Sequence, residues 1–466
     1  MGYGDGCRIP MEETPTVTHD EFTRMLPGFT LRQAMAEAER CLLCHDAPCS
    51  RGCPCGTDPA RFIRQLRFRN VRGAIRTIRG NNPLGGACGV LCPAARLCER
   101  DCATTTISSP IRIGKIQRAL IEQAWETGFR PAGRAPARAG RVAVVGSGPA
   151  GLSCAAEVAK AGFPVVVFEQ REKAGGVIRY GVPARRFDEQ FLERELDDIR
   201  ALGIEFRCSY PVRGPRSILG LLEDGFDAVF VAHGLWQAAS VQPQAGTLQG
   251  LHSSIDFLSS ARTEPVDALR AAVGRRRVAV VGGGDVALDC ALSALRLGAR
   301  DVYLVYRRSW AQMPATEEER VEAERAGVQF LLLNQPVEYL AGKGRSLRGI
   351  RLVRTRLSDP DSSGRRRPEE IPGSQWVLEI DLAIEAVGNV AEAEAGEWYP
   401  GVRRVAGRIV VDPKTGQTSI PGIFSGGDAV RGPSLVVEAV QDGKVAARGI
   451  VRLLEEKEAA RAAAGR

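Results

Sequence analysis

The chain has 466 residues, of which 44% are hydrophobic and 25% charged, a composition typical of a globular protein built from about three compact units. Its net charge of +8 is modest and dispersed over arginines, which disfavours nucleic-acid binding. Neither a signal peptide nor a run of about 20 apolar residues is evident, so we expect a cytoplasmic protein with no membrane span, whose thirteen cysteines serve metals.

The first predicted element is a helix over residues 30–40, which follows an extended lead-in. Its apolar residues repeat at helical spacing and lead directly into Cys41. The next part of the chain supplies further helical scaffold, to which we assign no chemistry. These helices are predicted around residues 62–66, 71–78 and 113–125. Residues 128–140, rich in Pro, Ala, Arg and Gly, indicate a linker at a domain boundary.

Two groups of cysteines lie among these helices. The first has the spacing C-x2-C-x4-C-x3-C-P and the second C-x5-C-x3-C. Three close cysteines and a fourth followed by proline are typical of segments that hold [4Fe–4S] clusters, in which the fourth cysteine ligates the other cluster. We therefore predict two clusters. The first is assigned Cys41, Cys44 and Cys49, and the second Cys53, Cys92, Cys98 and Cys102.

This assignment leaves the first cluster one ligand short. Cys55, Cys88 or a non-cysteine donor further along the chain could supply it. Structural zinc is the weaker alternative, because such sites normally pair one CxxC with another CxxC. A disulfide framework is typical of short secreted chains. The spacing therefore favours iron–sulfur chemistry.

Residues 141–169 contain the signature of a dinucleotide-binding unit. An apolar strand enters a G-x-G-x-x-G turn formed by Gly146, Gly148 and Gly151, and a second strand ends at Glu169. The glycines let backbone N–H groups approach a pyrophosphate at a helix N-terminus, and the acid can accept a hydrogen bond from a ribose hydroxyl. Strand, turn, helix, strand and acid in register make this a specific signal.

A second unit of the same kind begins at residue 277. Its turn contains Gly282, Gly284 and Asp285, but its second strand ends at Arg307-Arg308 where the first unit has an acid. Arginines at that position accommodate the 2′-phosphate of NADP, whereas an acid favours NAD. We therefore predict NADPH, with NADH possible, and two sites that are not equivalent. The alternative for the arginine pair is a solvated strand end.

Near the C-terminus, residues 422–428 indicate a short strand and a loop before a helix at about 434–454. Gly427 and Asp428 are similar to the late Gly-Asp that two-site flavoproteins place beside the ribityl and pyrophosphate groups of the flavin. The predicted architecture is α/β: a helical two-cluster iron–sulfur domain, then two Rossmann-like domains, with the nicotinamide domain inserted in the flavin domain. The boundaries are 1–139 for the iron–sulfur domain, 140–245 and 389–466 for the FAD-binding domain, and 246–388 for the NAD(P)H-binding domain; residues 357–372 are predicted as a loop or hairpin tip.

From about Arg40 the chain resembles the flavin and iron–sulfur electron-input unit shared by dihydropyrimidine dehydrogenase and the small subunit of glutamate synthase. The C-x5-C-x3-C spacing and the text Asn82-Pro-Leu-Gly are more similar to dihydropyrimidine dehydrogenases, above all the small subunit of the two-subunit bacterial enzyme. The resemblance implies Gln117 as the missing ligand of the first cluster and leaves two extra thiols. It also places Gly176 and Arg179 against the isoalloxazine ring of FAD.

The resemblance implies an electron-input subunit. NADPH reduces FAD, two [4Fe–4S] clusters relay single electrons, and a partner subunit with FMN and iron–sulfur clusters reduces uracil or thymine. The alternatives are a glutamate synthase small subunit, a subunit that exchanges electrons with ferredoxin, and a non-catalytic assembly factor, which two intact glycine turns disfavour. No catalytic triad is evident, and hydride transfer to a flavin needs none because the cofactor carries the chemistry.

Overall fold

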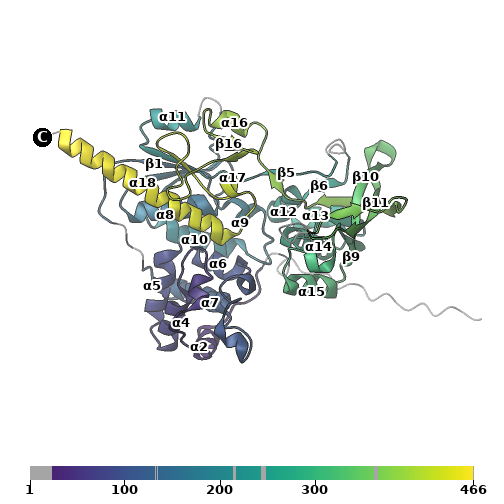
Figure 1. The fold of residues 1–466 in the computed structure, drawn as a ribbon, viewed down its shortest axis with the longest axis horizontal. Helices are drawn as coiled ribbons and strands as arrows, with labels where there is room; N and C mark the ends of the chain where they lie inside the picture. The colour runs from purple at the N-terminus through teal and green to yellow at the C-terminus, as the bar shows by residue number, and fades with distance from the viewer. Residues whose placement is uncertain are drawn as a thin grey trace, which may run out of the picture. The chain divides into compact units, whose positions relative to one another are not determined.

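The computed structural model describes residues 22, 24–131, 133, 135–213, 217–242, 248–360 and 366–464. The chain divides into two compact units, whose elements are labelled in Figure 1. The larger unit consists of Met25–Ala239 and Gly388–Arg466, and the smaller of Ser240–Val387, with which Met1–Arg24 is grouped. Residues 25–139 of the predicted iron–sulfur segment, and residues 140–239 and 389–466 of the predicted flavin segments, therefore lie in one compact unit.

The first part of the larger unit is helical, as predicted. Thr30 caps the first helix in a capping box with Gln33, and Asp58 and Asn70 cap the next long helices through their side chains. Apolar faces of these helices meet in one core that buries Phe62, Ile75 and their neighbours. The helices are α2 (Leu31–Glu39), α3 (Pro48–Arg51), α4 (Pro59–Arg67), α5 (Val71–Asn81), α6 (Gly85–Leu91) and α7 (Ile113–Glu126), with 3-10 turns at Ala94–Arg96 and Ala103–Thr106.

The second part of the larger unit is a parallel sheet in the order β18-β4-β1-β2-β3. Strands β1, β2 and β4 are buried along their whole length, which is why they are continuously apolar. The last strand, β18, comes from the chain beyond residue 388. The strands are β1 (Val142–Val145), β2 (Val165–Phe168), β3 (Glu205–Arg207), β4 (Ala228–Val231) and β18 (Ile423–Ser425).

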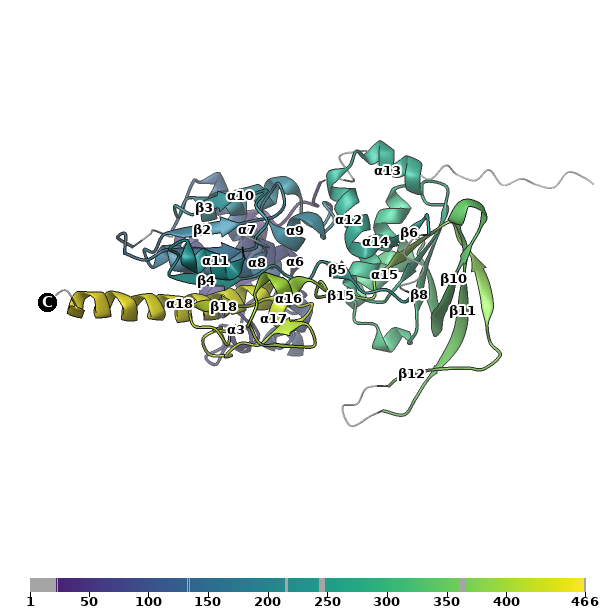
Figure 2. The same cartoon turned by 90° about the horizontal axis from the view of Figure 1, so that it is seen from above.

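Helices cover this sheet, and the long C-terminal helix α18 packs along α8 (Figures 1 and 2). The C-terminal helix extends ten residues beyond the predicted end, to Ala464. The helices are α8 (Pro149–Lys160), α9 (Gly176–Tyr180), α10 (Glu189–Arg200), α11 (Ile218–Glu223), α16 (Ala395–Trp398), α17 (Asp428–Arg431) and α18 (Val436–Ala464). Short strand pairs are β5 (Gln237–Ala238) with β15 (Asn389–Val390), and β16 (Arg404–Val405) with β17 (Arg408–Ile409).

The smaller unit repeats the parallel topology, in the order β6-β14-β7-β8-β9. An antiparallel sheet is inserted in the chain between the fourth and fifth of these strands, β9 and β14. Of this sheet only the hairpin at 357–372 was anticipated, and residues 361–365 of that hairpin lie outside the described residues. The parallel strands are β6 (Leu251–Ser253), β7 (Arg277–Val281), β8 (Asp301–Tyr306), β9 (Gln329–Leu332) and β14 (Leu382–Glu385). The antiparallel strands are β10 (Asn334–Ala341), β11 (Leu347–Leu357), β12 (Pro368–Glu370) and β13 (Trp376–Glu379). The helices are α12 (Ser254–Thr263), α13 (Val266–Val273), α14 (Asp285–Arg296) and α15 (Glu317–Arg325), with 3-10 turns at Trp310–Gln312 and Lys343–Arg345.

No helix in the described ranges is both long enough and apolar enough to cross a bilayer.

Candidate functional site

Four cysteines surround one recess in the helical part of the larger unit. Cys41 and Cys44 follow α2, Cys49 lies in α3, and Cys102 precedes the turn at Ala103–Thr106. The walls between them are apolar and include Ile63, Ile111 and Ile113. Burial, together with Cys41 and Cys102, raises the pKa of the Cys49 thiol to about 11. A ligating cysteine must be a thiolate, and bound iron would supply positive charge that stabilises it.

The recess corrects the predicted division of ligands. Cys102 lines it with Cys41, Cys44 and Cys49, whereas the spacing had placed Cys102 with the second cluster. Spacing along the chain does not show which way a cysteine faces within a turn. The Cys102 N–H donates to the Glu99 carbonyl at 3.2 Å. This turn places the Cys102 side chain in the helical core. The recess therefore brings four cysteines together without Gln117, and the ligands of each cluster remain a prediction.

Two of the remaining predicted cysteine ligands lie in a different environment, whereas Cys98 packs against the same helical core as Cys41 and Cys49. Cys53 and Cys92 pack against the core of the flavin part of the unit. Cys98 lies beside the turn that leads to Cys53, because a Cβ on Gly52 would come within 3.3 Å of the Cys98 Cα. No three Cys, His, Asp or Glu side chains in the described ranges converge closely enough to hold one metal ion.

Gln117 lies in α7, buried against α6. Its Nε2 donates to the Gly85 carbonyl at 2.6 Å, at the start of the helix that leads to Cys92. Its role as a ligand remains a prediction. With four cysteines at the first recess, the second group of Cys53, Cys92 and Cys98 is the one that still needs a fourth donor.

The glycine turn after β1 has the close backbone contacts that a dinucleotide site requires. Gly146 has φ +100°, and a Cβ there would lie 2.4 Å from the Ala232 carbonyl oxygen. A Cβ on Gly151 would lie 2.0 Å from the Gly146 oxygen, and one on Gly176 would lie 2.6 Å from the Gly148 Cα. A side chain at any of these three glycine positions would thus clash with the backbone. The turn at the N-terminus of α8 lets backbone N–H groups approach a pyrophosphate.

Glu169 stabilises this turn through hydrogen bonds. It is 6% exposed, and its Oε2 accepts from the N–H of Ser147 at 3.1 Å and from the Ser147 hydroxyl. Its Oε1 accepts from the N–H of Arg171 at 2.9 Å. A carboxylate has further lone pairs, so a ribose contact stays compatible with these bonds and remains a prediction. Ser147, which sequence reasoning missed, also accepts from the Gly175 N–H at 3.0 Å and so ties the turn to α9.

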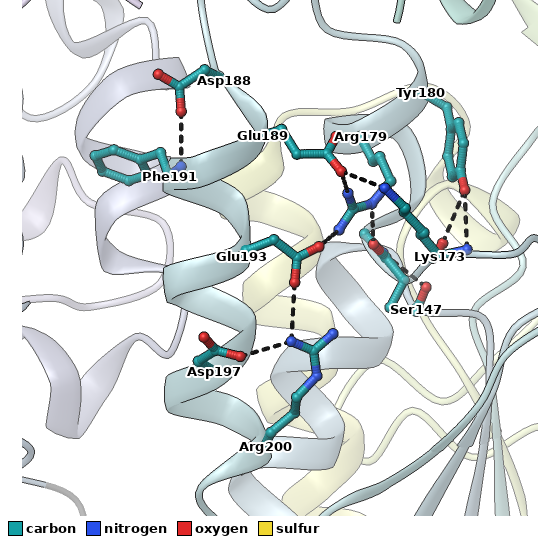
Figure 3. A network of polar contacts seen from close by, with 12 residues as sticks. Ser147, Lys173, Arg179, Tyr180, Asp188, Glu189, Phe191, Glu193, Asp197 and Arg200 are labelled. Carbon is teal, nitrogen blue, oxygen red and sulfur yellow. Dashed lines mark hydrogen bonds and ion pairs between the residues drawn. The ribbon is translucent and has the colours of Figure 1, made fainter. Parts of the chain in front are cut away.

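Arg179 joins α9 to α10 through a network of charged side chains (Figure 3). The guanidinium is 2% exposed and pairs with Glu189 at 2.7 Å and with Glu193. Arg200 pairs with the same Glu193 at 3.0 Å. Through these contacts Arg179 holds α9 against α10, next to the glycine turn. The predicted contact of Gly176 and Arg179 with an isoalloxazine ring is not tested by them.

The late Gly-Asp lies next to the same turn. Gly427 has φ +68°, and a Cβ there would be 2.9 Å from the Ala150 Cβ at the start of α8. Asp428 accepts from the Ser434 hydroxyl at 2.7 Å, and burial raises the pKa of its carboxyl group. The structure thus brings Gly427 beside the first glycine turn, although about 280 residues separate them in the sequence.

The second glycine turn repeats this geometry in the smaller unit. A Cβ on Gly282 would lie 2.4 Å from the Ala386 oxygen, and Gly284 caps α14 ahead of Asp285. Arg307 and Arg308 follow β8 directly. Within the described ranges, no ion pair joins either guanidinium to a carboxylate, and the role of the two arginines remains a prediction.

Two family models match the chain. The first, dihydropyrimidine dehydrogenase domain II with a 4Fe-4S cluster, matches residues 18–129. The second, pyridine nucleotide-disulphide oxidoreductase, matches residues 140–443. FprA from Mycobacterium tuberculosis in complex with NADPH has a similar fold, with a TM-score of 0.58 over 69% of this chain and 86% of that chain; at 21% identity it shows the fold alone.

Curated relatives cover nearly the whole chain. It is 35% identical over 437 residues to the NAD-dependent dihydropyrimidine dehydrogenase subunit PreT of Salmonella typhimurium, covering 94% of this chain and 97% of the relative. It is 32% identical over 452 residues to the glutamate synthase [NADPH] small chain of Escherichia coli, covering 93% and 94%. It is also 36% identical over 434 residues, 88% of this chain, to an NADP(+)-dependent formate dehydrogenase subunit beta of Moorella thermoacetica, of which it spans 60%.

These matches confirm the predicted fold class and the predicted resemblance. The chain belongs to the pyridine nucleotide-disulphide oxidoreductase family, joined to a 4Fe-4S domain of the dihydropyrimidine dehydrogenase type, and it is an NAD(P)H-dependent oxidoreductase that uses FAD and iron–sulfur clusters.

Proposed function

We propose that this chain is the electron-input subunit of a larger enzyme. It takes hydride from NADPH onto FAD and passes single electrons through two [4Fe–4S] clusters to a partner subunit. The observation that carries the proposal is the placement of the two cysteine groups. Cys53 and Cys92 of the second group pack on the flavin part of the unit, whereas Cys98 packs on the helical core with Cys41, Cys49 and Cys102.

This placement supports an order for the relay. Cys53 and Cys92 pack against a hydrophobic core that also contains Val144 and Ala150. Val144 lies in β1, before the flavin-type glycine turn, and Ala150 lies in the first turn of α8. Lys444, on α18, donates from Nζ to the Cys55 carbonyl at 2.7 Å and ties the cysteine loop to the same part of the unit. The Cys53 group, with Gln117 as its fourth donor, would therefore receive electrons from the flavin. The Cys41 group would pass them on.

The chain's own residues would bind and orient the cofactors. FAD supplies the hydride acceptor and releases electrons one at a time. The turn at Gly146–Gly151 would hold its pyrophosphate, with Glu169 at a ribose and Asp428 near the ribityl chain. Arg307 and Arg308 would select NADPH, because paired guanidinium groups suit the 2′-phosphate.

The helical part supports docking to an acidic partner surface. Residues 25–139 contain 18 Arg and Lys against 8 Asp and Glu. Leu42, which lines the Cys41 recess, is 48% exposed, so this recess lies close to the surface. Such a face suits a protein that takes electrons from the Cys41 group. We infer a partner with FMN and iron–sulfur clusters that reduces a pyrimidine, since a relative covered over 97% of its length is a dihydropyrimidine dehydrogenase subunit.

Anaerobic purification with the partner attached tests the proposal. Alone, the chain should reduce ferricyanide at the expense of NADPH but should not reduce uracil or thymine. With the partner, NADPH-dependent uracil reduction should appear. Pyrimidine reduction by the isolated chain would show that a terminal site had been missed. Co-purification with a glutamate synthase large subunit would replace the partner and leave the electron-input role intact.

A further inference from the structure

Two buried thiols outside the predicted ligand set each lie beside a cysteine within it. The Cys55 Sγ is 3.8 Å from the Cys53 Sγ, and the Cys88 side chain hydrogen-bonds with Cys92. Cys55 is 2% exposed and Cys88 is 5% exposed. The two contacts repeat one arrangement around the second cysteine group, with a non-ligand thiol against a ligand thiol each time.

Asn82 determines the direction of the hydrogen bond between Cys55 and Cys53. Its Oδ1 accepts from the Leu84 N–H at 2.9 Å, which assigns the other end of the amide as a donor. The Asn82 Nδ2 lies 3.5 Å from the Cys55 Sγ, and the same side chain hydrogen-bonds with Cys88. An amide NH2 can only donate, so the Cys55 sulfur accepts from Asn82. The proton of the Cys55 thiol is then left for Cys53.

Two further observations around Cys55 agree with this direction. The Thr57 Oγ1 lies 3.0 Å from the Cys55 Sγ and can donate to it, while the Thr57 N–H donates to the Cys53 Sγ at 3.4 Å. A cysteine that ligates iron is a thiolate and has no proton to give. With a cluster bound, Cys53 can therefore only accept from Cys55.

We propose that Cys55 and Cys88 donate S–H hydrogen bonds to Cys53 and Cys92, two ligands of the second cluster, and that Asn82 orients the Cys55 thiol. Hydrogen bonds to the sulfurs of an iron–sulfur cluster help to set its potential, since they stabilise the added negative charge of the reduced state. The two thiols thus make this cluster a better electron acceptor for the flavin. The proposal rests on the proposed function in one respect, that Cys53 and Cys92 hold a cluster.

The test compares full-length proteins reconstituted anaerobically. Cys55→Ala and Cys88→Ala remove each donor, Cys55→Ser keeps a hydroxyl donor, and Cys290→Ala removes a buried thiol from the smaller unit as the control. Iron analysis and potentiometric titration followed by electron paramagnetic resonance give the readout, and a Cys92→Ser variant identifies the signal of the second cluster. Each Ala variant should keep all of its iron. Its reduction equilibrium for the second cluster should weaken about threefold to tenfold, where tenfold equals 59 mV for one electron.

Cys55→Ser should shift the potential less than Cys55→Ala, and Cys290→Ala should leave both clusters unchanged. Loss of about four irons from either Ala variant would make that cysteine a ligand and overturn the proposal. Full iron content with an unshifted potential would also overturn it. If the Ala variants fail to fold, Thr57→Val should give a smaller shift of the same sign, and no shift would refute the role of Cys55. Wild-type protein that binds no iron would instead refute the proposed function.

Discussion

Glu195 is the buried carboxylate that joins α10 to the cysteine-bearing helix α6, and its removal tests how the two parts of the larger unit are held together. Its Oε1 and Oε2 accept from the Gly86 and Ala87 N–H groups, each at 2.8 Å, and Arg79 pairs with it at 3.3 Å. The Glu195 side chain is 0% exposed and that of Arg79 is 6% exposed. Glu195→Ala therefore strands a buried cation and two buried donors.

The expected loss of unfolding free energy follows from these contacts. Breaking a buried ion pair by removing one partner costs about 3–5 kcal/mol, and an unsatisfied buried donor costs about 1–3 kcal/mol. These costs overlap here, and Arg79 keeps its second partner, Asp198, at 2.5 Å. We expect a loss of about 3–5 kcal/mol in urea unfolding. Glu205→Ala is the matched control, because Glu205 forms an exposed pair with Arg207 and should cost below about 1 kcal/mol.

The same variant has a functional readout. If Glu195 holds α6 in place, flavin reduction by NADPH should keep its rate while the appearance of reduced iron–sulfur signal slows in rapid-mixing experiments. Glu195→Ala with a stability loss no greater than that of Glu205→Ala, or with unchanged electron transfer to the clusters, would refute the reasoning.

Three further predictions concern single sites. Replacing both Arg307 and Arg308 with alanine should raise KM for NADPH more than tenfold and leave KM for NADH unchanged, since charge-assisted hydrogen bonds contribute about 1.5–3 kcal/mol each. Steady-state kinetics in which the wild type prefers NADH would contradict this prediction. Cys98→Ala should lose about four of about eight irons and keep one flavin, and loss of flavin as well would count against separate sites. Burial lowers the pKa of His233 from 6.5 to about 4, so between these pH values the unfolded chain binds a proton at this residue and the folded chain does not. The free energy of unfolding should therefore fall by up to about 3 kcal/mol from pH 6.5 to pH 4. His233→Gln should flatten that pH profile.

Sequence motifs predicted well those parts of the structure that depend on residues close together in the chain. The glycine turns at Gly146 and Gly282 could be read from the sequence, because strand, turn and helix follow one another within a few residues. The side of the molecule that Cys102 faces could not, because it depends on a turn packing into a core built from distant helices. The contacts of Asn82 with Cys55 and of Glu195 with Gly86 were not predicted, because these partners are far apart along the chain.

The smaller unit shows the same limit. Its parallel sheet repeats a familiar order and was anticipated from the second glycine turn. Strand β10 was not, because bulges interrupt its alternation.

The most direct test of the central claim is to reduce the anaerobic protein with NADPH and follow flavin absorbance and cluster paramagnetism together. The account predicts about eight irons and one FAD per chain, bleaching of the flavin, and a reduced [4Fe–4S] signal that follows it. A flavin that NADPH reduces while bound clusters stay oxidised even under excess reductant, or a protein that binds FAD and no iron, would contradict it.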